Sequence, residues 1–252
     1  MNTSRREVIR ELLLKKPFVS LHELELLIPD VSSMTLRRDI EYFEEIGEAI
    51  KVRGGARSMK FITTSMEDNF ALRMKENDDI KEKLARRAIP LIEPGRSIFL
   101  DSGTTMLRLA TMMPDARLTV TTTGPNIALE LVKKGQTIVN IVGGMLNRDN
   151  ISVSGNQALR FFDDINIDIA FIVPSGASSV HGLTCGNYIE CELKHLIVEK
   201  ARHVVLLLDA SKFDRSLPYT FCGLEEVDTI ITNRPLPPDF AGKCRADVLI
   251  AE

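Results

Sequence analysis

From residue 91 onward, short apolar runs alternate with helical segments, and no other feature of the sequence limits the possible folds as strongly. The apolar runs fall at 97–100, 118–123, 137–142, 167–173, 204–208 and 229–232, and helical patterns lie between most of them, at 104–113, 125–134, 155–163 and 188–201. Parallel strands need a crossover connection, usually a helix. The alternation therefore predicts an α/β domain with a mostly parallel sheet.

Small, hydroxyl-bearing or charged residues follow five of the predicted strands directly. In an open parallel sheet, ligands bind outside the carboxyl ends of the strands, so we expect these residues to lie near one another. The candidates are Asp101, Ser102, Gly103, Thr104, Thr105, Thr122, Thr123, Gly143, Gly144, Ser175, Gly176, Asp209 and Lys212. Thr184, just before the helical segment 188–201, and Glu190 and Lys194 within it complete the set.

The chemistry of these candidates suits an anion that also carries hydroxyl groups. Glycine lets the backbone approach a ligand, and hydroxyls together with free N–H groups at a helix start can bind phosphate. Lys212 follows a strand end, where its ammonium can neutralise phosphate as a point charge. We therefore expect a phosphorylated, polyhydroxylated small molecule. For the loop 102–105 alone, a capped helix start is the simpler interpretation, because Ser, Thr and Asp favour that position.

The first 60 residues have a different pattern, that of short helices followed by a hairpin. We expect Ser4 to cap a first helix, Ser20 a second, and Ser32 or Ser33 a third. The third helix has apolar positions at i, i+4 and i+7, namely Leu36, Ile40 and Phe43.

The third helix carries a polar face opposite its apolar stripe. A short helix, a tight turn and a helix with an exposed polar N-terminal half match helix-turn-helix geometry, in which one helix enters the major groove of DNA. The hairpin that follows would form a wing beside that groove. The candidate DNA-binding residues are Ser32, Ser33, Thr35, Arg37, Arg38, Arg53, Gly54, Gly55 and Arg57. The alternative is a small helical oligomerisation module with a solvated charged face.

The segment Ser32-Ser33-Met34-Thr35-Leu36-Arg37-Arg38-Asp39-Ile40, with Gly47 and Arg53-Gly54-Gly55-Ala56, resembles the DNA-binding signature of the DeoR family of bacterial transcriptional regulators. That family has a Ser-x-x-Thr-(Ile/Leu)-Arg-Arg-Asp-Leu helix, a glycine after it and a Gly-Gly-Ala wing. Pro29 departs from the small polar turn that is usual there. The resemblance implies a winged helix-turn-helix domain at 1–58, a linker at 59–75 and an effector-binding α/β domain at 76–252.

Residues 75–232 resemble the sensor domain of the same family, which belongs to the sugar-isomerase-like superfamily with ribose-5-phosphate isomerase. By this resemblance, the loop Ser102-Gly103-Thr104-Thr105 and Lys212 contact phosphate, whereas Glu190, Glu192 and Lys194 match a charged helix motif less closely and buttress the pocket. The family has Thr-Asn after the second strand, where this chain has Thr121-Thr122-Thr123-Gly124-Pro125-Asn126. We expect a hydroxyl of Thr122 or Thr123 to replace that asparagine.

The main alternative is a sugar-phosphate isomerase-like enzyme with an appended helical domain. Aldose–ketose isomerisation needs a carboxylate that moves a proton between adjacent carbons, and isomerases of this superfamily carry acidic residues in a loop after a central strand. The corresponding loop here, 174–179, has no Asp or Glu. We therefore predict binding without turnover, with no catalytic residue, cofactor or metal. A third alternative is a protein-binding scaffold without DNA affinity. In that case the arginine pairs Arg37/Arg38 and Arg53/Arg57 would have no function.

The composition indicates how the protein can bind DNA and in which cellular compartment it is expected. The net charge is −3, so DNA binding depends on the local placement of arginines rather than on bulk charge. We find no run of about 18 uncharged apolar residues and no apolar signal core at the start, so we expect neither a membrane span nor export. The four cysteines are Cys185, Cys191, Cys222 and Cys244, and their separation favours reduced thiols in a cytosol.

These inferences predict a cytoplasmic DNA-binding regulator, a repressor of carbohydrate-metabolism genes that a phosphorylated sugar releases from operator DNA. Such coupling requires two states that differ in ligand affinity. The family resemblance also implies a homo-oligomer, because one winged module buries too little DNA for tight, specific binding.

Overall fold

The computed structural model describes residues 2–16, 18–29, 31–52, 54–58 and 70–252. Arg53 and the part of the expected linker at 59–69 lie outside the described residues. The chain divides into two compact units, Met1–Met66 and Glu67–Glu252. Each unit has hydrophobic clusters of its own.

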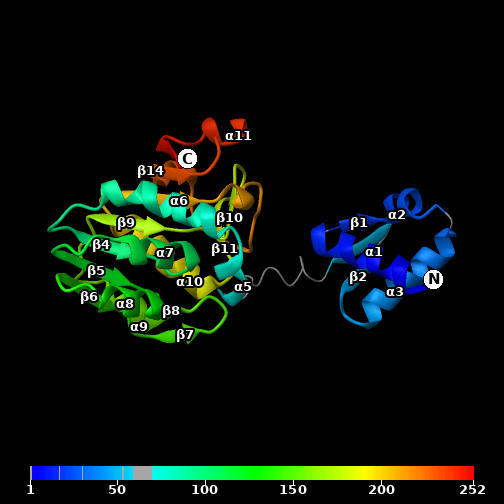
Figure 1. Ribbon diagram of the computed structural model, residues 1–252, viewed down its shortest axis with the longest axis horizontal. Helices are drawn as coiled ribbons and strands as arrows, with labels where there is room; N and C mark the ends of the chain where they lie inside the picture. Colours follow the sequence, from blue (N-terminus) through cyan, green and yellow to red (C-terminus); the bar gives the residue numbers. More distant parts are fainter. Residues whose placement is uncertain (1, 17, 30, 53, 59–69) are drawn as a thin grey trace. The chain divides into compact units, whose positions relative to one another are not determined.

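The described residues of the first unit form three helices and a small sheet (Figure 1). Its elements are α1 (Asn2–Lys15), β1 (Phe18–Ser20), α2 (Leu21–Leu27), α3 (Ser33–Glu45), β2 (Ala49–Val52) and β3 (Gly55–Ser58). Strands β2 and β3 form an antiparallel hairpin, and β1 pairs with the other side of β3. The helix, turn, helix and hairpin wing thus follow one another in the predicted order.

The apolar stripe of α3 faces the core of the first unit. That core contains Ile9, Leu13, Val19, Leu24, Leu36, Ile40, Phe43, Ala49 and Ala56. Helix α2 begins at a serine cap, because Ser20 accepts a hydrogen bond from the backbone N–H of Glu23 (3.0 Å). Helix α3 ends before Gly47, which adopts a positive φ of 74° that favours glycine. Because one face of α3 packs against the core, its opposite face is exposed.

The second unit is built on a seven-stranded sheet in which the paired strands are all parallel. Its strands are β4 (Ser97–Leu100), β5 (Leu118–Thr122), β6 (Thr137–Ile141), β9 (Ile169–Ile172), β12 (Val204–Leu208), β14 (Thr229–Thr232) and β15 (Asp247–Ile250). They lie in the order β15-β14-β12-β9-β4-β5-β6. The chain builds outward from β4 to β6 and then resumes at β9 on the other side of β4. The strand order therefore reverses between β4 and β9, which is where open α/β sheets bind ligands.

Helices cover both faces of this sheet (Figure 1). The helices of the second unit are α5 (Phe70–Lys75), α6 (Asp78–Ala88), α7 (Thr104–Met112), α8 (Pro125–Leu131), α9 (Asn156–Phe161), α10 (Tyr188–Lys200) and α11 (Pro238–Ala241), with the 3₁₀ turns η1 (Ile89–Leu91), η2 (Ala210–Lys212) and η3 (Leu224–Glu226). Helices α6, α7 and α8 share one core layer with Ile98 and Leu100 of β4, whereas α9 and α10 share the other with Phe99. The alternation of strand side chains thus creates a three-layer α/β/α sandwich.

Short antiparallel strands complete the second unit. They are β7 (Met145–Asn147), β8 (Ser152–Ser154), β10 (Gly176–Ser178), β11 (Gly182–Cys185) and β13 (Tyr219–Cys222). Strands β7 and β8 form one hairpin, and β10, β11 and β13 form a three-stranded sheet.

The predicted fold class is confirmed, and the differences concern local detail. Helix α1 begins at Asn2, so the expectation that Ser4 caps it was wrong. Strands β1 and β15 and the short antiparallel strands were not expected from the sequence. Helix α5 lies within the stretch 59–75 that the sequence analysis assigns to a linker. No helix in the described part of the chain has the length and apolarity needed to cross a membrane.

Candidate DNA-binding surface and ligand pocket

Three hydroxyl side chains hold the turn that precedes α3. Ser32 caps the helix: its side chain accepts a hydrogen bond from the backbone N–H of Thr35 (3.3 Å), and its Oγ lies 2.9 Å from Thr35 Oγ1. Ser33 Oγ donates to Glu25 Oε1 of α2 (2.5 Å). The Ser32 contacts fix the start of α3, and the bond from Ser33 to Glu25 joins α3 to α2 across the turn.

The exposed face of α3 carries two neighbouring arginines. Arg37 and Arg38 are exposed, whereas Leu36 and Ile40 on the opposite face are buried. One α-helix fits the major groove of DNA, and guanidinium groups bind phosphate oxygens or the edge of guanine. The surface of α3 therefore has the shape and the charge that a DNA-reading helix needs.

The wing is tied to α3 by a lysine. Lys51 of β2 places its Nζ 2.6 Å from Glu41 Oε1, and its backbone N–H donates to Glu44 Oε1 (2.9 Å). The hydrogen bond from Lys51 lowers the pKa of Glu41, with the charge of the lysine adding to the effect. The wing and the helix thus form one surface.

Each of the two glycines of the wing is required for a different structural reason. Gly54 has a φ of +88°, a conformation that side chains rarely adopt. A Cβ on Gly55 would lie 2.2 Å from the carbonyl oxygen of Val19, because β1 pairs closely there. Arg57 lies in β3, but its side chain is outside the described set, as is all of Arg53.

Asp39 is buried between α3 and α1. Its carboxylate accepts hydrogen bonds from Arg5 Nε (2.5 Å), Arg5 Nη2 (3.0 Å) and Arg6 Nε (3.0 Å). Burial alone would raise the pKa of Asp39, but the hydrogen bonds and charges of Arg5 and Arg6 outweigh burial and lower the pKa. This residue of the Arg-Arg-Asp motif therefore holds the helix rather than facing solvent.

A pocket lies where β4, β9 and β12 end, at the reversal of strand order. Its lining consists of Gly103, Thr104 and Thr105 at the start of α7, Val173, Pro174 and Ser175 after β9, Asp209, Ser211 and Lys212 after β12, and Arg73, Glu76, Asn77 and Lys81 from α5 and α6. The cavity measures about 70 Å³. The N-terminus of α7 supplies free backbone N–H groups and the positive end of a helix dipole. The arrangement suits a small anionic group.

A buried ion cluster joins two of the loops beside this pocket, the loop after β4 and the loop after β9. Lys194 Nζ of α10 lies 2.8 Å from Asp101 Oδ2 and 3.2 Å from Glu190 Oε1, and it donates to the carbonyl of Val173 (2.7 Å). Asp101 also accepts hydrogen bonds from the backbone N–H groups of Ser102 (2.8 Å) and Val173 (3.1 Å). The cluster therefore clamps the end of β4 to the end of β9.

Six of the candidates from the sequence meet in the pocket, namely Gly103, Thr104, Thr105, Ser175, Asp209 and Lys212. Four others, Asp101, Ser102, Glu190 and Lys194, form or adjoin the ion cluster. Gly143 and Gly144 are exposed after β6 and are not among the residues that line the pocket.

The remaining candidates are buried beside other chain segments. Thr122 Oγ1 accepts a hydrogen bond from the backbone N–H of Gly124 (3.0 Å), whereas the buried Thr123 Oγ1 has no hydrogen-bond partner among the described residues. Thr184 Oγ1 donates to the carbonyl of Gly176 (3.2 Å) and accepts from Leu217 N–H (3.0 Å). Thr184 and Gly176 thus join β10 and β11 rather than line the pocket.

The pocket wall formed by α5 and α6 was not predicted from the sequence. Lys81 was the detectable member: with Leu84, Ala85 and Ala88 it occupies one face of α6 at spacings of three and four residues. The presence of a lysine on an apolar helix face was therefore the feature of the sequence from which this pocket wall could have been predicted. Arg73, by contrast, reaches the pocket only through the tertiary arrangement.

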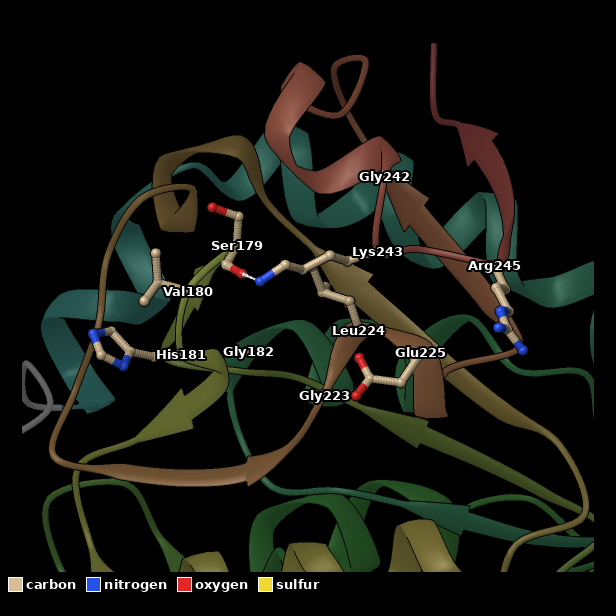
Figure 2. Close-up of a pocket in the computed structure, with 10 residues that line it drawn as sticks. All are labelled: Ser179, Val180, His181, Gly182, Gly223, Leu224, Glu225, Gly242, Lys243 and Arg245. Atoms are coloured by element: carbon tan, nitrogen blue, oxygen red, sulfur yellow. Dashed lines mark hydrogen bonds between the residues drawn. The ribbon is translucent and has the colours of Figure 1, made fainter.

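A larger cavity, of about 490 Å³, lies elsewhere in the second unit (Figure 2). It is lined by the β10–β11 turn, the chain around η3 and the chain after α11, and Lys243 Nζ donates across it to the carbonyl of Ser179 (2.6 Å). Among its lining residues in the described chain, none comes from the loops after β4, β9 or β12. Size alone does not make it the ligand site, since the ends of the central parallel strands, where the strand order reverses, lie at the smaller pocket.

Known protein families match both units. Residues 5–61 match the family described as DeoR-like helix-turn-helix domain, and residues 76–234 match the DeoR C terminal sensor domain. A solved structure of ribose 5-phosphate isomerase A from Methanocaldococcus jannaschii is 18% identical, covers 55% of each chain and superimposes with a TM-score of 0.41. That likeness is too distant to carry a function.

Full-length relatives agree with the family match. The HTH-type transcriptional regulator IolR of Bacillus subtilis is 32% identical over 97% of this chain and 96% of its own. The glycerol-3-phosphate regulon repressor of Escherichia coli is 30% identical over 93% of this chain and 92% of its own. Both relatives are named for a role in transcriptional regulation. The chain therefore belongs to the DeoR family of transcriptional regulators and is not an enzyme.

Proposed function

We propose that this protein represses carbohydrate-metabolism genes by binding operator DNA through α3 and the wing, and that a phosphorylated sugar in the pocket at β4, β9 and β12 releases it. The observation that carries the proposal is the position of the pocket. It lies at the strand-order reversal, with a helix N-terminus and Lys212 converging on one small cavity. The name of the glycerol-3-phosphate regulon repressor supports an effector that bears phosphate.

In this proposal the DNA-binding residues are those of the exposed α3 face and the wing. Arg37 and Arg38 contact bases or phosphates, while Ser32, Ser33 and Thr35 set the approach of the helix and offer hydroxyls to the backbone of DNA. Gly54 and Gly55 shape the wing, and Arg53 and Arg57 contact phosphate from it. The surface contacts supply affinity that depends on salt.

The effector-binding residues are assigned by their place around the pocket. Thr104, Thr105 and Lys212 bind the phosphate, with Gly103 allowing its close approach, and Ser175 and Asp209 face the remainder of the ligand. Lys194 and Asp101 keep the loops in position. The proposal further divides the chain into a DNA-binding domain at 1–58, a connecting segment at 59–75 and an effector-binding domain at 76–252, within a cytoplasmic homo-oligomer.

The test is a pair of binding measurements on the purified full chain. The promoter of its own operon serves as the first DNA fragment, and a panel of sugar phosphates is screened by thermal shift with each unphosphorylated sugar as the control. A phosphorylated sugar should raise the unfolding temperature and weaken DNA binding. Arg37→Ala should abolish specific binding to the fragment, whereas Lys212→Ala should keep DNA binding and lose the response to the sugar. Retained operator binding by Arg37→Ala, or normal release of Lys212→Ala, contradicts the respective assignment.

A further inference from the structure

Lys81 occupies a position that lysine rarely takes. It lies on the apolar face of α6 and is only 7% exposed. Burial lowers the pKa of Lys81, while Asp78, Glu76 and Asp209 act in the opposite direction. A buried charge is unfavourable unless it is paired and hydrogen-bonded. The fold therefore keeps an ammonium group at this wall of the pocket, where an apolar side chain would pack with less penalty.

The ammonium of Lys81 holds the end of α5. Lys81 Nζ donates hydrogen bonds to the carbonyl oxygens of Arg73 and Glu76. Arg73 is in the last turn of α5 and Glu76 directly follows the helix, so these are carbonyls that helix geometry leaves without an internal partner. An ammonium group has three donors, and the bonds to described residues use two of them. One N–H remains for an acceptor in the pocket.

The pocket around Lys81 carries an excess of positive charge. Its lining includes three cationic side chains, Arg73, Lys81 and Lys212, and two carboxylates, Glu76 and Asp209. Asp209 already accepts hydrogen bonds from Asn77 Nδ2 (2.9 Å) and from the backbone N–H of Ser211 (2.9 Å). An anion that entered the cavity would therefore meet cationic groups from two elements, Lys212 after β12 and Lys81 on α6.

We propose that Lys81 is an anion-binding residue of this pocket and that an anion bound between Lys81 and Lys212 stabilises α5 through the Lys81 bonds to its carbonyls. The inference rests on the proposed sensor function and names a regulatory contact within the same site. Helix α5 begins at Phe70, shortly after the first unit ends at Met66. An anion in the pocket thereby stabilises the chain segment next to this boundary.

The first experiment measures the affinity of inorganic phosphate for the full-length protein by calorimetry. Lys81→Met should weaken phosphate binding by at least about tenfold, because it removes a charge-assisted hydrogen bond. Lys81→Arg keeps the charge and should recover part of the affinity. Lys83→Met, on an exposed position of the same helix, is the matched control and should bind phosphate like the wild type.

Hydrogen exchange of the wild type gives a second readout that does not depend on a variant that folds. Added phosphate should slow exchange of the amides in 70–77, and a merely structural lysine would leave them unchanged. Phosphate binding of unchanged affinity in folded Lys81→Met, or no protection of α5 in the wild type with phosphate bound, overturns the role of Lys81 while leaving the sensor pocket standing. A wild type that binds no phosphate refutes both the pocket and this inference, whereas loss of operator binding alone refutes only the proposed repressor function.

Discussion

At the scale of single residues, the most informative side chains are those whose burial conflicts with their polarity. Asp39 belongs to a motif of three charged residues, and only its helical spacing from Leu36 and Phe43 distinguishes it from the two arginines before it. In the structure it is 1% exposed and bound by two arginines of α1, whereas Arg37 and Arg38 are exposed. The motif thus combines two functions in adjacent positions, because helical geometry turns Asp39 toward the core and the arginines toward solvent.

Replacement of Asp39 should destabilise the first unit. Asp39→Asn leaves Arg5 with its charge but without a carboxylate partner, and breaking a buried pair in this way costs about 3 kcal/mol of unfolding free energy. Chemical denaturation followed by circular dichroism measures the change. Glu48→Gln breaks the exposed pair with Arg10 and should have little effect, which makes it the matched control. Equal effects of the two variants would contradict the assignment.

The same carboxylate should make the first unit sensitive to acid. Its pKa is lowered in the folded state, so its contribution to stability is present above the unfolded value of about 3.9 and is lost as the pH falls through the folded value. The unfolding temperature of the wild type should fall relative to Asp39→Asn as the pH is lowered below about 4. Parallel pH curves for the two proteins would show that Asp39 is not the titrating group.

Thr123 tests whether an unpartnered hydroxyl serves a ligand. Thr123→Val removes a buried hydroxyl that makes no hydrogen bond within the described chain, so the unfolding free energy should rise by about 1 kcal/mol. Thr122→Val is the control, since it breaks the bond to the N–H of Gly124 and should lower stability by a similar amount. If Thr123→Val is more stable and also binds the sugar phosphate more weakly, the hydroxyl serves the ligand; unchanged affinity removes it from the site.

At the scale of elements, the close pairing of β1 with β3 decides the shape of the wing. Gly55→Ala would force a Cβ to within 2.2 Å of the carbonyl oxygen of Val19, so β1 has to shift or the hairpin has to open. We expect the first unit to lose about 2 kcal/mol of stability and DNA binding to weaken. Denaturation of the variant tests this expectation, and Gly242→Ala, at a glycine with open space around it, is the control. Wild-type stability of Gly55→Ala would contradict the close approach.

The elements also show what sequence patterns can predict. Six strands of the parallel sheet were expected from apolar runs, of which all but the edge strand β6 are largely buried, and the residues that follow the strands identified six of the residues that line the pocket. Strand β1 has three residues and exists through its pairing with β3, some 37 positions later, which no local pattern encodes. Arg73 was missed for the same reason, because the chain brings α5 beside Lys212 only in the folded unit, whereas Lys81 had a local signal in its place on the apolar face of α6.

At the scale of the whole molecule, the protein consists of two units with separate cores. Because the cores are separate, calorimetry should show two unfolding transitions rather than one. A ligand stabilises only the unit to which it binds, so operator DNA should raise the transition of the first unit and the sugar phosphate that of the second. Asp39→Asn should lower the first transition alone and thereby identify it.

When both ligands are present, each should reduce the shift produced by the other, since a negative coupling between two sites is reciprocal. Shifts that add without loss would mean that the two sites are not coupled, and the pocket would then bind its ligand without regulating DNA.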